Sequence, residues 1–520
     1  MQEENIVAKS ATRTQSVDDR RGVPSHVDVL IVGAGLSGVG VASHLTTKQP
    51  GRTFAIVDAR DAIGGTWDLF RYPGIRSDSD LHTFGYAFKP WTGKNSIADG
   101  REILEYIQET LDDYGLEPHI HLGHKVISAN FSTQAGLWTV TLERTLDGAL
   151  VELTCSWLFS AAGYFDYDGG YTPDFKGRND FEGQVVHPQA WPDDLDYTGK
   201  NVVVIGSGAT AVTLIPAMAD CVGHITMLQR SPTYVVKIPK QDPIAQVVKK
   251  LLPPKLAYQV ARTISANRIR LIYGASQRYP DAVRGLIRKA TIKSLPDGFD
   301  VDTHFKPEYG PWDQRMCTVP DGDLFESLSS GKASIVTDSI VRMTPRGILL
   351  KSGQELEADL VVTATGLNMV PYGKIEFSVD GENVDLHRTL VYKAAMLSGV
   401  PNFAFAFGYT NSSWTLKVDL VAEYLCRLLA HMDRGGYSVA LPVDDDPTVI
   451  RSTFSNMDSG YFRRSAHLYP QQGSHGSWTM PQSYAADRAR LRDGDLDDPS
   501  LHLSSPVGEI APSLKQVASV

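Results

Sequence analysis

The chain has little cysteine, and the few cysteines it has are far apart. Among its 520 residues there are four, Cys155, Cys221, Cys317 and Cys426, and no two of them form a Cys-x-x-Cys pair. A flavin-dependent disulfide reductase needs two neighbouring sulfur atoms, so this spacing argues against that class of enzyme. Separated cysteines are typical of free thiols in a reducing compartment, and we therefore expect a cytoplasmic protein.

Long apolar runs and an excess of positive charge are also missing. No apolar run reaches the roughly 20 residues of a membrane span, and the acidic, polar residues 1–5 do not resemble a secretory signal. The net charge of −10 argues against a nucleic-acid partner, because binding phosphates needs a basic surface. His119, His121 and His124 lie close together, but no carboxylate or cysteine completes a ligand set, so no metal site is expected.

The chain does contain two glycine-rich loops, and each stands between a predicted strand and a predicted helix. The first loop, residues 33–38, follows the apolar run 27–32, and the second, residues 206–211, follows the apolar run 201–205. Ala211 replaces the third glycine of the second loop, which the dinucleotide-binding pattern tolerates. Glycines let the backbone approach a pyrophosphate, whose charge then lies at a helix N-terminus. Two dinucleotide-binding units are therefore predicted, the alternative being glycine turns in an ordinary α/β sheet.

The residue at the tip of the next strand has opposite charge in the two units. It is Asp58 in the first unit and Arg230 in the second. A carboxylate there accepts hydrogen bonds from a ribose diol, whereas an arginine suits a 2′-phosphate. The difference predicts FAD for the first unit and NADPH for the second, unless Arg230 is an ordinary surface arginine. The predicted FAD contacts are Gly33, Gly35, Ser37, Gly38 and Asp58, and the predicted NADPH contacts are Gly206, Ser207, Gly208, Ala209, Thr210, Arg230 and Ser231.

The pattern of the whole chain predicts an α/β fold with two Rossmann-like dinucleotide-binding domains and a helical insertion. Antiparallel strands are expected over residues 126–130, 137–143 and 150–155, and buried strands over residues 157–163 and 359–366. The segment after residue 240 is helical in pattern and rich in Lys and Arg. The expected parts are a disordered tail (1–24), an FAD domain in two pieces (25–166 and 370–482), an NADPH domain in two pieces (167–239 and 310–369), a helical insertion (240–309) and a polar C-terminal tail (483–520).

Between the two units lies a string that resembles a family fingerprint. Residues 181–192 read FxGxxxHxxxWP, with Phe181, Gly183, His187 and Trp191 at the fixed positions. This string is similar to the fingerprint of the flavin-dependent Baeyer–Villiger monooxygenases, a family of class B flavoprotein monooxygenases. Related N-oxygenating flavin monooxygenases usually lack the tryptophan. The resemblance covers about residues 26–480, and residues 64–80, 311–317 and 408–415 look like the ethionamide-activating branch of the family.

The resemblance implies a catalytic arginine and a carboxylate that holds it. Arg315 matches the active-site arginine of the family, and Asp78 matches the aspartate that orients it. Reduced flavin and its oxygen adduct are both anionic, so a fixed guanidinium stabilises them in a site with little water. The residues themselves also allow two ordinary roles, a surface ion pair of Arg315 with Asp313 and a helix N-cap at Asp78.

Further site residues follow from the same resemblance. It implies that Gly65, Thr66, Trp67 and Asp78 contact FAD, and that His187 couples nicotinamide binding to domain movement. His187 would look the same as a core histidine whose ring is satisfied by a backbone carbonyl. Gln314, implied in NADPH binding, stands where one branch of the family has lysine, which leaves more of the 2′-phosphate selectivity to Arg230. Trp478 resembles a mobile-loop tryptophan near the nicotinamide and substrate, or is a plain packing tryptophan.

The function implied is an NADPH-dependent flavin monooxygenase. Through a flavin C4a-(hydro)peroxide it would convert ketones into esters or lactones and would oxygenate sulfides and thioamides. Its partners would be O₂ and a small-molecule ketone or sulfide. Two alternatives stay open, an N-oxygenating flavin monooxygenase and an FAD/NADPH reductase or oxidase that inserts no oxygen.

Overall fold

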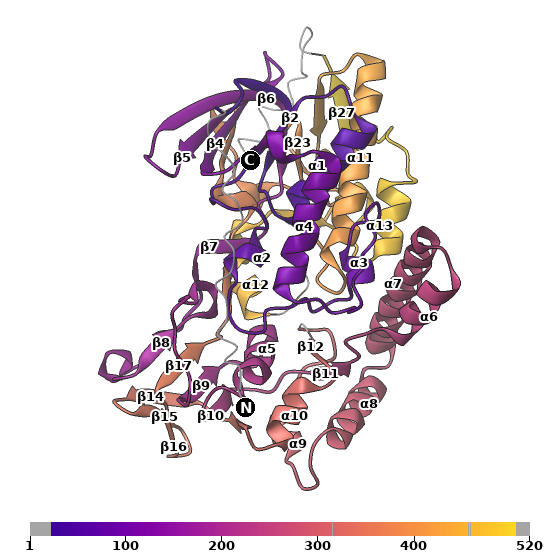
Figure 1. The fold of residues 1–520 in the computed structure, drawn as a ribbon. Helices are drawn as coiled ribbons and strands as arrows, with labels where there is room; N and C mark the ends of the chain where they lie inside the picture. The colour runs from indigo at the N-terminus through magenta and orange to yellow at the C-terminus, as the bar shows by residue number, and fades with distance from the viewer. Residues whose placement is uncertain (1–21, 315, 456, 458, 506–520) are drawn as a thin grey trace, which may run out of the picture.

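The computed structural model describes residues 22–505 except 315, 456 and 458. Most of the N-terminal tail, Arg315 and the end of the C-terminal tail therefore lie outside the described residues. Two sheets with flanking helices are stacked along the long axis of the molecule, and a group of helices covers one side (Figure 1). The α/β fold with Rossmann-type units is confirmed.

The upper sheet in Figure 1 is built around the first glycine loop. Strand β1 (His26–Val32) runs parallel to β2 (Phe54–Val57) on one side and to β6 (Leu150–Ser160) on the other. Helix α1 (Leu36–Lys48) connects β1 to β2, which is the expected strand, turn, helix and strand. The sheet has nine strands, in the order β20-β19-β4-β5-β6-β1-β2-β3, and β23 (Phe403–Phe405) also pairs with β6.

Three long antiparallel strands extend this sheet, as the sequence predicts. They are β4 (His124–Ser132), β5 (Leu137–Arg144) and β6. The two separate strands predicted over residues 150–155 and 157–163 are one strand, because β6 continues without a turn from an exposed hairpin into the buried centre. The remaining members are β3 (Ile120–His121), β19 (Glu376–Val379) and β20 (Glu382–Asn383).

The second glycine loop lies in a separate parallel sheet. Its order is β13-β10-β9-β17-β8, and every neighbouring pair is parallel. The strands are β8 (Gln184–Val186), β9 (Asn201–Ile205), β10 (His224–Gln229), β13 (Ala333–Thr337) and β17 (Leu360–Thr363). Helix α5 (Ala209–Met218) follows β9, and α10 (Asp323–Ser329) packs beside α5.

Two short strands connect the sheets. The chain leaves the first sheet through β7 (Phe165–Gly170) and returns through β18 (Leu367–Met369), and the two pair antiparallel. Smaller elements complete the fold, namely α2 (Thr66–Leu69), α3 (Leu81–Phe84), α4 (Gly100–Tyr114), α12 (Gly460–Ser465), β11 (Val235–Ile238), β12 (Cys317–Pro320), β14 (Ile340–Thr344), β15 (Gly347–Leu350), β16 (Glu355–Glu357), β21 (Val391–Tyr392), β22 (Met396–Leu397), β25 (Arg451–Thr453) and β26 (Gln471–Gly473).

Four helices occupy the segment where the sequence predicts a helical insertion. They are α6 (Pro243–Leu251), α7 (Pro254–Arg278), α8 (Pro280–Lys293) and α9 (Val301–Phe305). A proline at the start of each of the first three sets their N-termini, since proline fits the first helical turn. Helix α7 packs against α3, an element of the first part of the chain. Among the described residues, no helix combines the length and apolarity that crossing a membrane requires.

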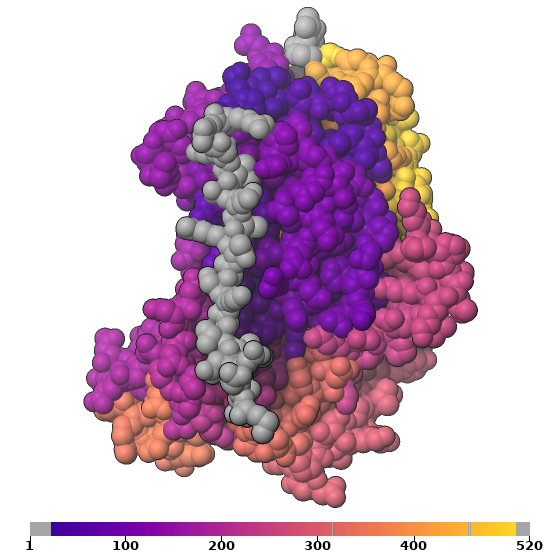
Figure 2. Space-filling view, viewed as in Figure 1, coloured from indigo at the N-terminus to yellow at the C-terminus, as the bar shows by residue number. Residues whose placement is uncertain are grey.

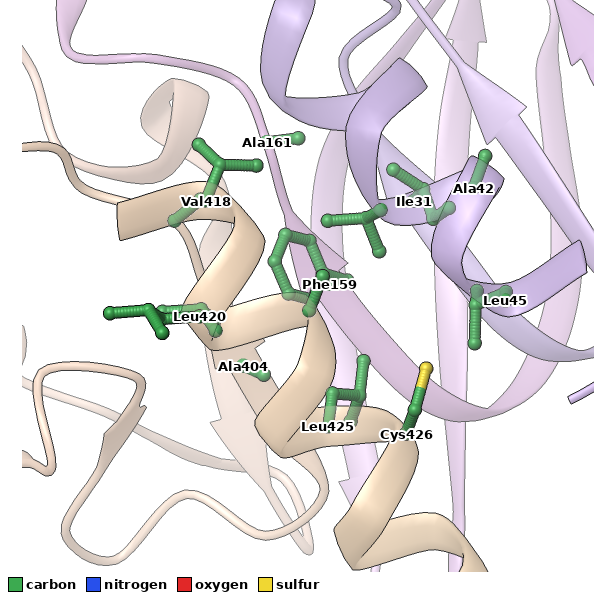
Figure 3. Packing of buried hydrophobic residues seen from close by; sticks show 14 of the residues in the cluster. Ile31, Ala42, Leu45, Phe159, Ala161, Ala404, Val418, Leu420, Leu425 and Cys426 are labelled. Atoms are coloured by element: carbon green, nitrogen blue, oxygen red, sulfur yellow. The ribbon is translucent and has the colours of Figure 1, made fainter. Parts of the chain in front are cut away.

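The largest core lies between α1 and α11 (Trp414–Gly435), which pack together over the upper sheet. Figure 3 shows Phe159 of β6 between α11, which carries Leu425, and α1, which carries Leu45. All three are at most 1% exposed, and burying each stabilises the fold by about 2 kcal/mol. The first glycine loop is therefore held on a rigid, dry base.

The segment predicted as a polar C-terminal tail is folded over much of its length. Helix α13 (Tyr484–Leu491) packs on α11, and β27 (Leu501–Ser504) pairs with β24 (Val439–Pro442). The polar composition of this segment does not mean that it is exposed, because Asp487 forms buried ion pairs with Lys417 and Arg490.

Candidate active site

The first glycine loop has the geometry that a dinucleotide needs. Gly33 has a φ of +111°, and a Cβ there would lie 2.5 Å from the Ala161 carbonyl oxygen, so only glycine fits. A Cβ on Gly38 would lie 1.9 Å from the Gly33 oxygen. Gly35 begins α1, and Gly65 approaches it closely, because a Cβ on Gly35 would lie 3.6 Å from the Gly65 Cα. The backbone is therefore open to a pyrophosphate from this side.

Asp58 lies at the tip of β2 and faces this loop. Its carboxylate accepts hydrogen bonds from the backbone N–H groups of Ala34 at 2.7 Å and Arg60 at 2.9 Å. Burial raises the pKa of Asp58, and these two donors oppose that rise. Each carboxylate oxygen retains a second acceptor position, so the group can still receive a ribose hydroxyl.

The segment after Gly64 forms the second wall of the loop. Gly64 donates its backbone N–H to the Ala34 carbonyl at 3.0 Å. The Thr66 hydroxyl lies 3.1 Å from that of Tyr167, and Trp67 packs edge-on against Phe84. The Ser37 hydroxyl accepts a hydrogen bond from the Trp414 indole at 2.7 Å, so its side chain holds α1 against α11. The predicted contact of Ser37 with FAD stays a prediction.

The second glycine loop repeats the arrangement. Gly206 has a φ of +140°, and a Cβ there would lie 2.3 Å from the Ala364 carbonyl oxygen. Gly208 is the N-cap of α5, and no described atom lies within 4 Å of a Cβ built on it. Ala209 and Thr210 form the first turn of α5, where backbone N–H groups are unpaired within the helix. The Thr210 side chain is hydrogen-bonded to Tyr72, whose pKa burial raises to about 12.

Arg230 and its neighbours flank the outer side of this loop. Arg230 and Ser231 are exposed directly after β10. The Ser207 hydroxyl lies 2.8 Å from the Thr233 hydroxyl and 3.4 Å from the Ser231 carbonyl oxygen. A guanidinium and several hydroxyls at one strand tip fit the 2′-phosphate of NADPH.

Asp78 lies on a loop that spans both halves of the molecule. A Cβ on Gly74 of this loop would lie 2.6 Å from Ala217 of α5, so the loop contacts the second unit directly. Arg76 forms an ion pair with Asp323 of α10. The N-cap of α3 is Asp80, whose carboxylate accepts from the Thr83 N–H at 3.1 Å. The capping alternative therefore applies to Asp80 and leaves Asp78 for another role.

Strand β12 brings three predicted site segments together. The Thr318 hydroxyl donates to the Asp78 carbonyl oxygen at 3.3 Å, and the Cys317 thiol donates to the Ser207 carbonyl oxygen at 3.7 Å. Gln314 is half-buried and pairs with Pro311 in an isolated bridge. Arg315 itself lies outside the described residues, but it stands between Gln314 and β12 in the sequence.

Phe181 and Gly183, the first two fingerprint residues, lie against each other. Phe181 is 8% exposed within a core cluster beside β9 and β17. A Cβ on Gly183 would lie 2.5 Å from the Phe181 ring and 2.5 Å from the Asp359 carbonyl oxygen. The glycine is therefore needed because the phenylalanine ring lies over it. Trp191, at the other end of the fingerprint, packs edge-on against Tyr197.

His187 lies where the two connecting strands meet. Its Nε2–H donates to the Gly366 carbonyl oxygen at 3.1 Å, and its Nδ1 accepts from the Gln189 backbone N–H at 3.2 Å. The ring lies against Gly170, where a Cβ would come within 1.9 Å of it. Burial lowers the pKa of His187 and so favours the neutral ring. The proton of that ring lies on Nε2, because Nδ1 accepts a backbone N–H. Both features expected of His187 are therefore present: its ring nitrogens are satisfied by backbone groups, and it lies at the strands that link the two units.

Sequence reasoning missed a second residue that holds the linkers. The Arg464 guanidinium of α12 lies 3.6 Å from the centre of the Tyr171 ring and donates to the Leu367 carbonyl oxygen at 3.3 Å. His187 thus holds β18 from the side of the second unit, and Arg464 holds it from the side of the first. No sequence signal marks this arginine, because its partners are nearly 100 and 300 residues away.

Trp478 is a packing tryptophan. It is 3% exposed, lies in the main core and packs edge-on against Tyr392 at 5.6 Å. A Cβ on Gly473 would lie 2.6 Å from its Cβ, so the surroundings are shaped to this side chain. The packing alternative describes these contacts, and the position beside nicotinamide and substrate stays a prediction.

A family model agrees with the two-unit fold. Residues 30–274 match the model described as pyridine nucleotide-disulphide oxidoreductase. The four cysteines of this chain are free, and three of them are buried. The match therefore reflects the shared nucleotide-binding fold, and the chain lacks the neighbouring sulfurs of a disulfide reductase.

Curated relatives resemble the chain over nearly its whole length. FAD-containing monooxygenase EthA of Mycobacterium tuberculosis is 49% identical over 487 residues, which cover 93% of this chain and 99% of that protein. The probable FAD-binding monooxygenase AlmA of Acinetobacter baylyi is 47% identical over 481 residues, covering 92% and 96%.

Solved structures share the fold. Oxidized steroid monooxygenase bound to NADP matches with a TM-score of 0.72 and 21% identity over 92% of this chain and 100% of that one. Cyclohexanone monooxygenase bound to ε-caprolactone matches with a TM-score of 0.70 and 21% identity, again over 92% and 100%. The chain therefore has the fold of the Baeyer–Villiger monooxygenases and belongs to the family of FAD-containing monooxygenases of the EthA type.

Proposed function

We propose that this flavin monooxygenase inserts one atom of O₂ into ketones, giving esters or lactones, and oxygenates sulfides and thioamides at the expense of NADPH. The fold neighbour bound to ε-caprolactone supports the first reaction, because this lactone is cyclohexanone with one oxygen atom inserted into the ring. The EthA-type relatives support the oxygenase chemistry, since they are named FAD-containing monooxygenases. Small-molecule substrates and O₂ would be the partners, and we keep the cytoplasm as the expected compartment.

The chain's own residues fit both cofactors. FAD would lie on Gly33, Gly35 and Gly38, with its ribose at Asp58. NADPH would lie on the loop at Gly206, with its 2′-phosphate at Arg230. When bound and reduced, the flavin supplies the reaction with O₂ that the protein lacks side chains to perform.

The observation that carries the proposal is the convergence at β12. Thr318 contacts the Asp78 loop, and Cys317 contacts the second glycine loop. Both residues follow Arg315 within three positions of the chain. Arg315 therefore precedes, along the chain, a strand that contacts both nucleotide units.

We infer that Arg315 stabilises negative charge where the two cofactors meet, and that Asp78 orients it. A guanidinium fixed before the reaction costs no reorganisation, and with little water its charge acts strongly. Asp78 would act on the geometry, since a misplacement of about 1 Å can lower a rate about 100-fold. His187 would keep β7 and β18 together while the second unit changes position.

The test is a product analysis with matched variants. Purified protein, NADPH and O₂ are given ketones and thioethers, and products and NADPH loss are measured together. We expect esters or lactones and sulfoxides, and expect Asp78→Ala to lower product formation about 100-fold, while Asp80→Ala mainly lowers stability, by about 1 kcal/mol. Consumption of NADPH that yields hydrogen peroxide alone with every substrate would contradict the proposal, as would oxygenation of tertiary amines in preference to ketones.

A further inference from the structure

The helical segment from α6 to α8 differs in charge from the rest of the molecule. Residues 243–293 contain eleven Lys and Arg and a single acidic residue, Asp281, in a chain whose net charge is −10. Seven of the basic side chains are exposed, namely Lys250, Lys255, Arg270, Arg278, Arg288, Lys289 and Lys293. The segment is therefore a strongly cationic surface on an acidic protein. It forms one outer side of the molecule (Figure 2).

The same segment carries most of the large apolar side chains that the structure exposes. Nine of the fifteen exposed large hydrophobic residues among the described part of the chain lie between positions 244 and 292. On α6, Ile244, Val247 and Leu251 recur at intervals of three and four and are 48%, 55% and 75% exposed. Leu256, in the first turn of α7, is 46% exposed. We call Ile244, Val247, Leu251 and Leu256, with Lys250 and Lys255 beside them, the α6 face.

The opposite sides of α6 and α7 are firmly attached to the body. The Arg262 guanidinium is buried and donates to the carbonyl oxygens of His82, Thr83 and Gly85 at 2.6–3.1 Å. It also forms an ion pair with the buried Asp419 of α11 at 3.0 Å. The exposed face of α6 is therefore not the result of loose packing.

The N-terminus of α6 is also held in place. Asp242 caps this helix through the N–H groups of Ile244 and Ala245, at 2.9 and 3.2 Å. Its other carboxylate oxygen pairs with Arg268 of α7 at 2.7 Å. The α6 face thus points outward from a fixed base.

We propose that the α6 face docks on the surface of a phospholipid bilayer that contains anionic headgroups. An amphipathic helix with apolar residues on one face and lysines beside them lies in the plane of a membrane interface. The apolar side chains would enter the headgroup and acyl boundary, while the lysine stems reach back to the phosphates. The remaining cations of α7 and α8 would attract the anionic surface from a distance.

Two other occupants fit the face less well. A nucleic acid would neutralise the lysines but would leave the apolar stripe in water. A second copy of the chain, joined face to face, would bring two equally cationic surfaces together, whereas a head-to-tail contact would give a defined oligomer only if its rotation closes a ring. The proposal concerns surface binding and does not depend on the reaction proposed above.

Vesicle flotation of the full-length holoenzyme tests the proposal. Vesicles of phosphatidylcholine alone are compared with vesicles that also contain phosphatidylglycerol, at low and high salt. We expect binding to the anionic vesicles that weakens as salt rises. Each basic residue near an anionic surface strengthens binding roughly fivefold, so Lys250→Glu with Lys255→Glu should weaken it by more than about tenfold.

Matched variants separate the α6 face from general effects. Val247→Ser with Leu251→Ser should also weaken vesicle binding. Leu146→Ser, at a residue 86% exposed in the β5–β6 turn, and Lys351→Glu on the second unit should leave it unchanged. Flavin absorbance and NADPH oxidation without vesicles report that each variant is folded.

Three outcomes would overturn the proposal. The first is wild-type protein that does not float with anionic vesicles, and the second is a set of α6-face variants that bind as well as wild type. The third is a change of sedimentation in the α6-face variants without vesicles, which would identify the face as a contact between copies of the chain.

Discussion

At the scale of single residues, the two nucleotide units differ most in the charge at one strand tip. Asp58 is held by two backbone N–H groups in a buried position, where burial raises its pKa. Arg230 is exposed at the corresponding tip. A dinucleotide with a 2′-phosphate would suit the second position and be repelled by the first. We therefore expect the two sites to distinguish their cofactors by charge at one residue each.

We predict that Arg230→Ala raises the KM for NADPH by about 10- to 100-fold. A charge-assisted hydrogen bond to phosphate contributes about 1.5–3 kcal/mol, and the variant loses it. The KM for NADH should change little, because NADH has no 2′-phosphate. Steady-state kinetics with both nucleotides check this, with Lys332→Ala, which removes another exposed cation of the second unit, as control. Equal losses for the two nucleotides would contradict the assignment.

A second residue-scale prediction concerns pH and His187. Burial lowers the pKa of His187 from its ordinary 6.5, so the unfolded chain binds a proton more readily than the folded one. The stability contribution is therefore present above pH 6.5 and is lost as the pH falls below it. His187→Gln, which cannot be protonated, should show a smaller loss of unfolding free energy at acid pH than wild type. Urea unfolding at a series of pH values measures the difference, and parallel curves would refute the prediction.

The role of a residue was predictable where a backbone conformation or a close contact requires that residue type. Gly33 and Gly206 need their positive φ, and Gly183 is required by the ring of Phe181, so these positions follow from local sequence. The contacts of Ser37 and Trp478 could not be predicted, because their partners Trp414 and Tyr392 are supplied by distant segments. Arg464 was invisible for the same reason.

At the scale of elements, α13 is attached to α11 by a buried charge cluster. Lys417 and Asp487 are 3% and 0% exposed, and their charged atoms are 2.7 Å apart. The Tyr409 hydroxyl donates to the same carboxylate at 2.8 Å, and Arg490 donates to its other oxygen at 3.0 Å. Burial lowers the pKa of Lys417 to about 8, and the Asp487 carboxylate opposes this shift.

We predict that Lys417→Met destabilises the protein by about 3 kcal/mol, because it leaves Asp487 buried with one cation fewer. Lys417→Met combined with Asp487→Leu should be less destabilising than the sum of the two single changes, since no unpaired charge is left. Urea denaturation of the four proteins gives the coupling energy. Additive effects would show that the pair is not coupled.

Elements were predictable where a period is regular. The antiparallel strands β4 and β5 and the parallel strands β1 and β9 follow from their apolar patterns. The continuity of β6 was missed because a change from alternating to continuous apolar residues looks like a boundary. Here it marks the point where a strand passes from its exposed N-terminal end into the buried centre of the sheet.

At the scale of the whole molecule, two strands connect the nucleotide units. β7 and β18 are held by His187 from one side and by Arg464 from the other. The chain passes between the units through this pair, so a change in their relative position should affect it. The fingerprint histidine and an arginine outside every motif therefore act on the same linker.

We predict that Arg464→Ala lowers the yield of oxygenated product per NADPH consumed while changing stability by less than about 1 kcal/mol, since the arginine is exposed. Loss of the contact with Tyr171 frees β18 and makes the position of the two units less defined. Arg464→Lys keeps the charge but loses the planar stack on Tyr171. Its yield of oxygenated product per NADPH should therefore fall nearly as far. A wild-type yield of oxygenated product per NADPH in both variants would show that Arg464 has no role in linking the two units.

The position of the helical segment could not be predicted from sequence. Its charge and helical pattern are plain, but the Arg262–Asp419 pair joins residues 157 positions apart. A chain segment that follows the second glycine loop thus packs on α3 and α11, which belong to the first nucleotide unit. Tertiary pairing of this kind leaves no local signal.

The central claim is that this protein passes one atom of dioxygen to an organic substrate. The most direct measurement supplies the holoenzyme with NADPH, ¹⁸O₂ and a ketone, and determines the label in the product by mass spectrometry. The account predicts an ester or lactone carrying one ¹⁸O atom, in amounts that follow NADPH consumption. Unlabelled product, or NADPH consumption whose labelled oxygen ends entirely in hydrogen peroxide, would contradict it.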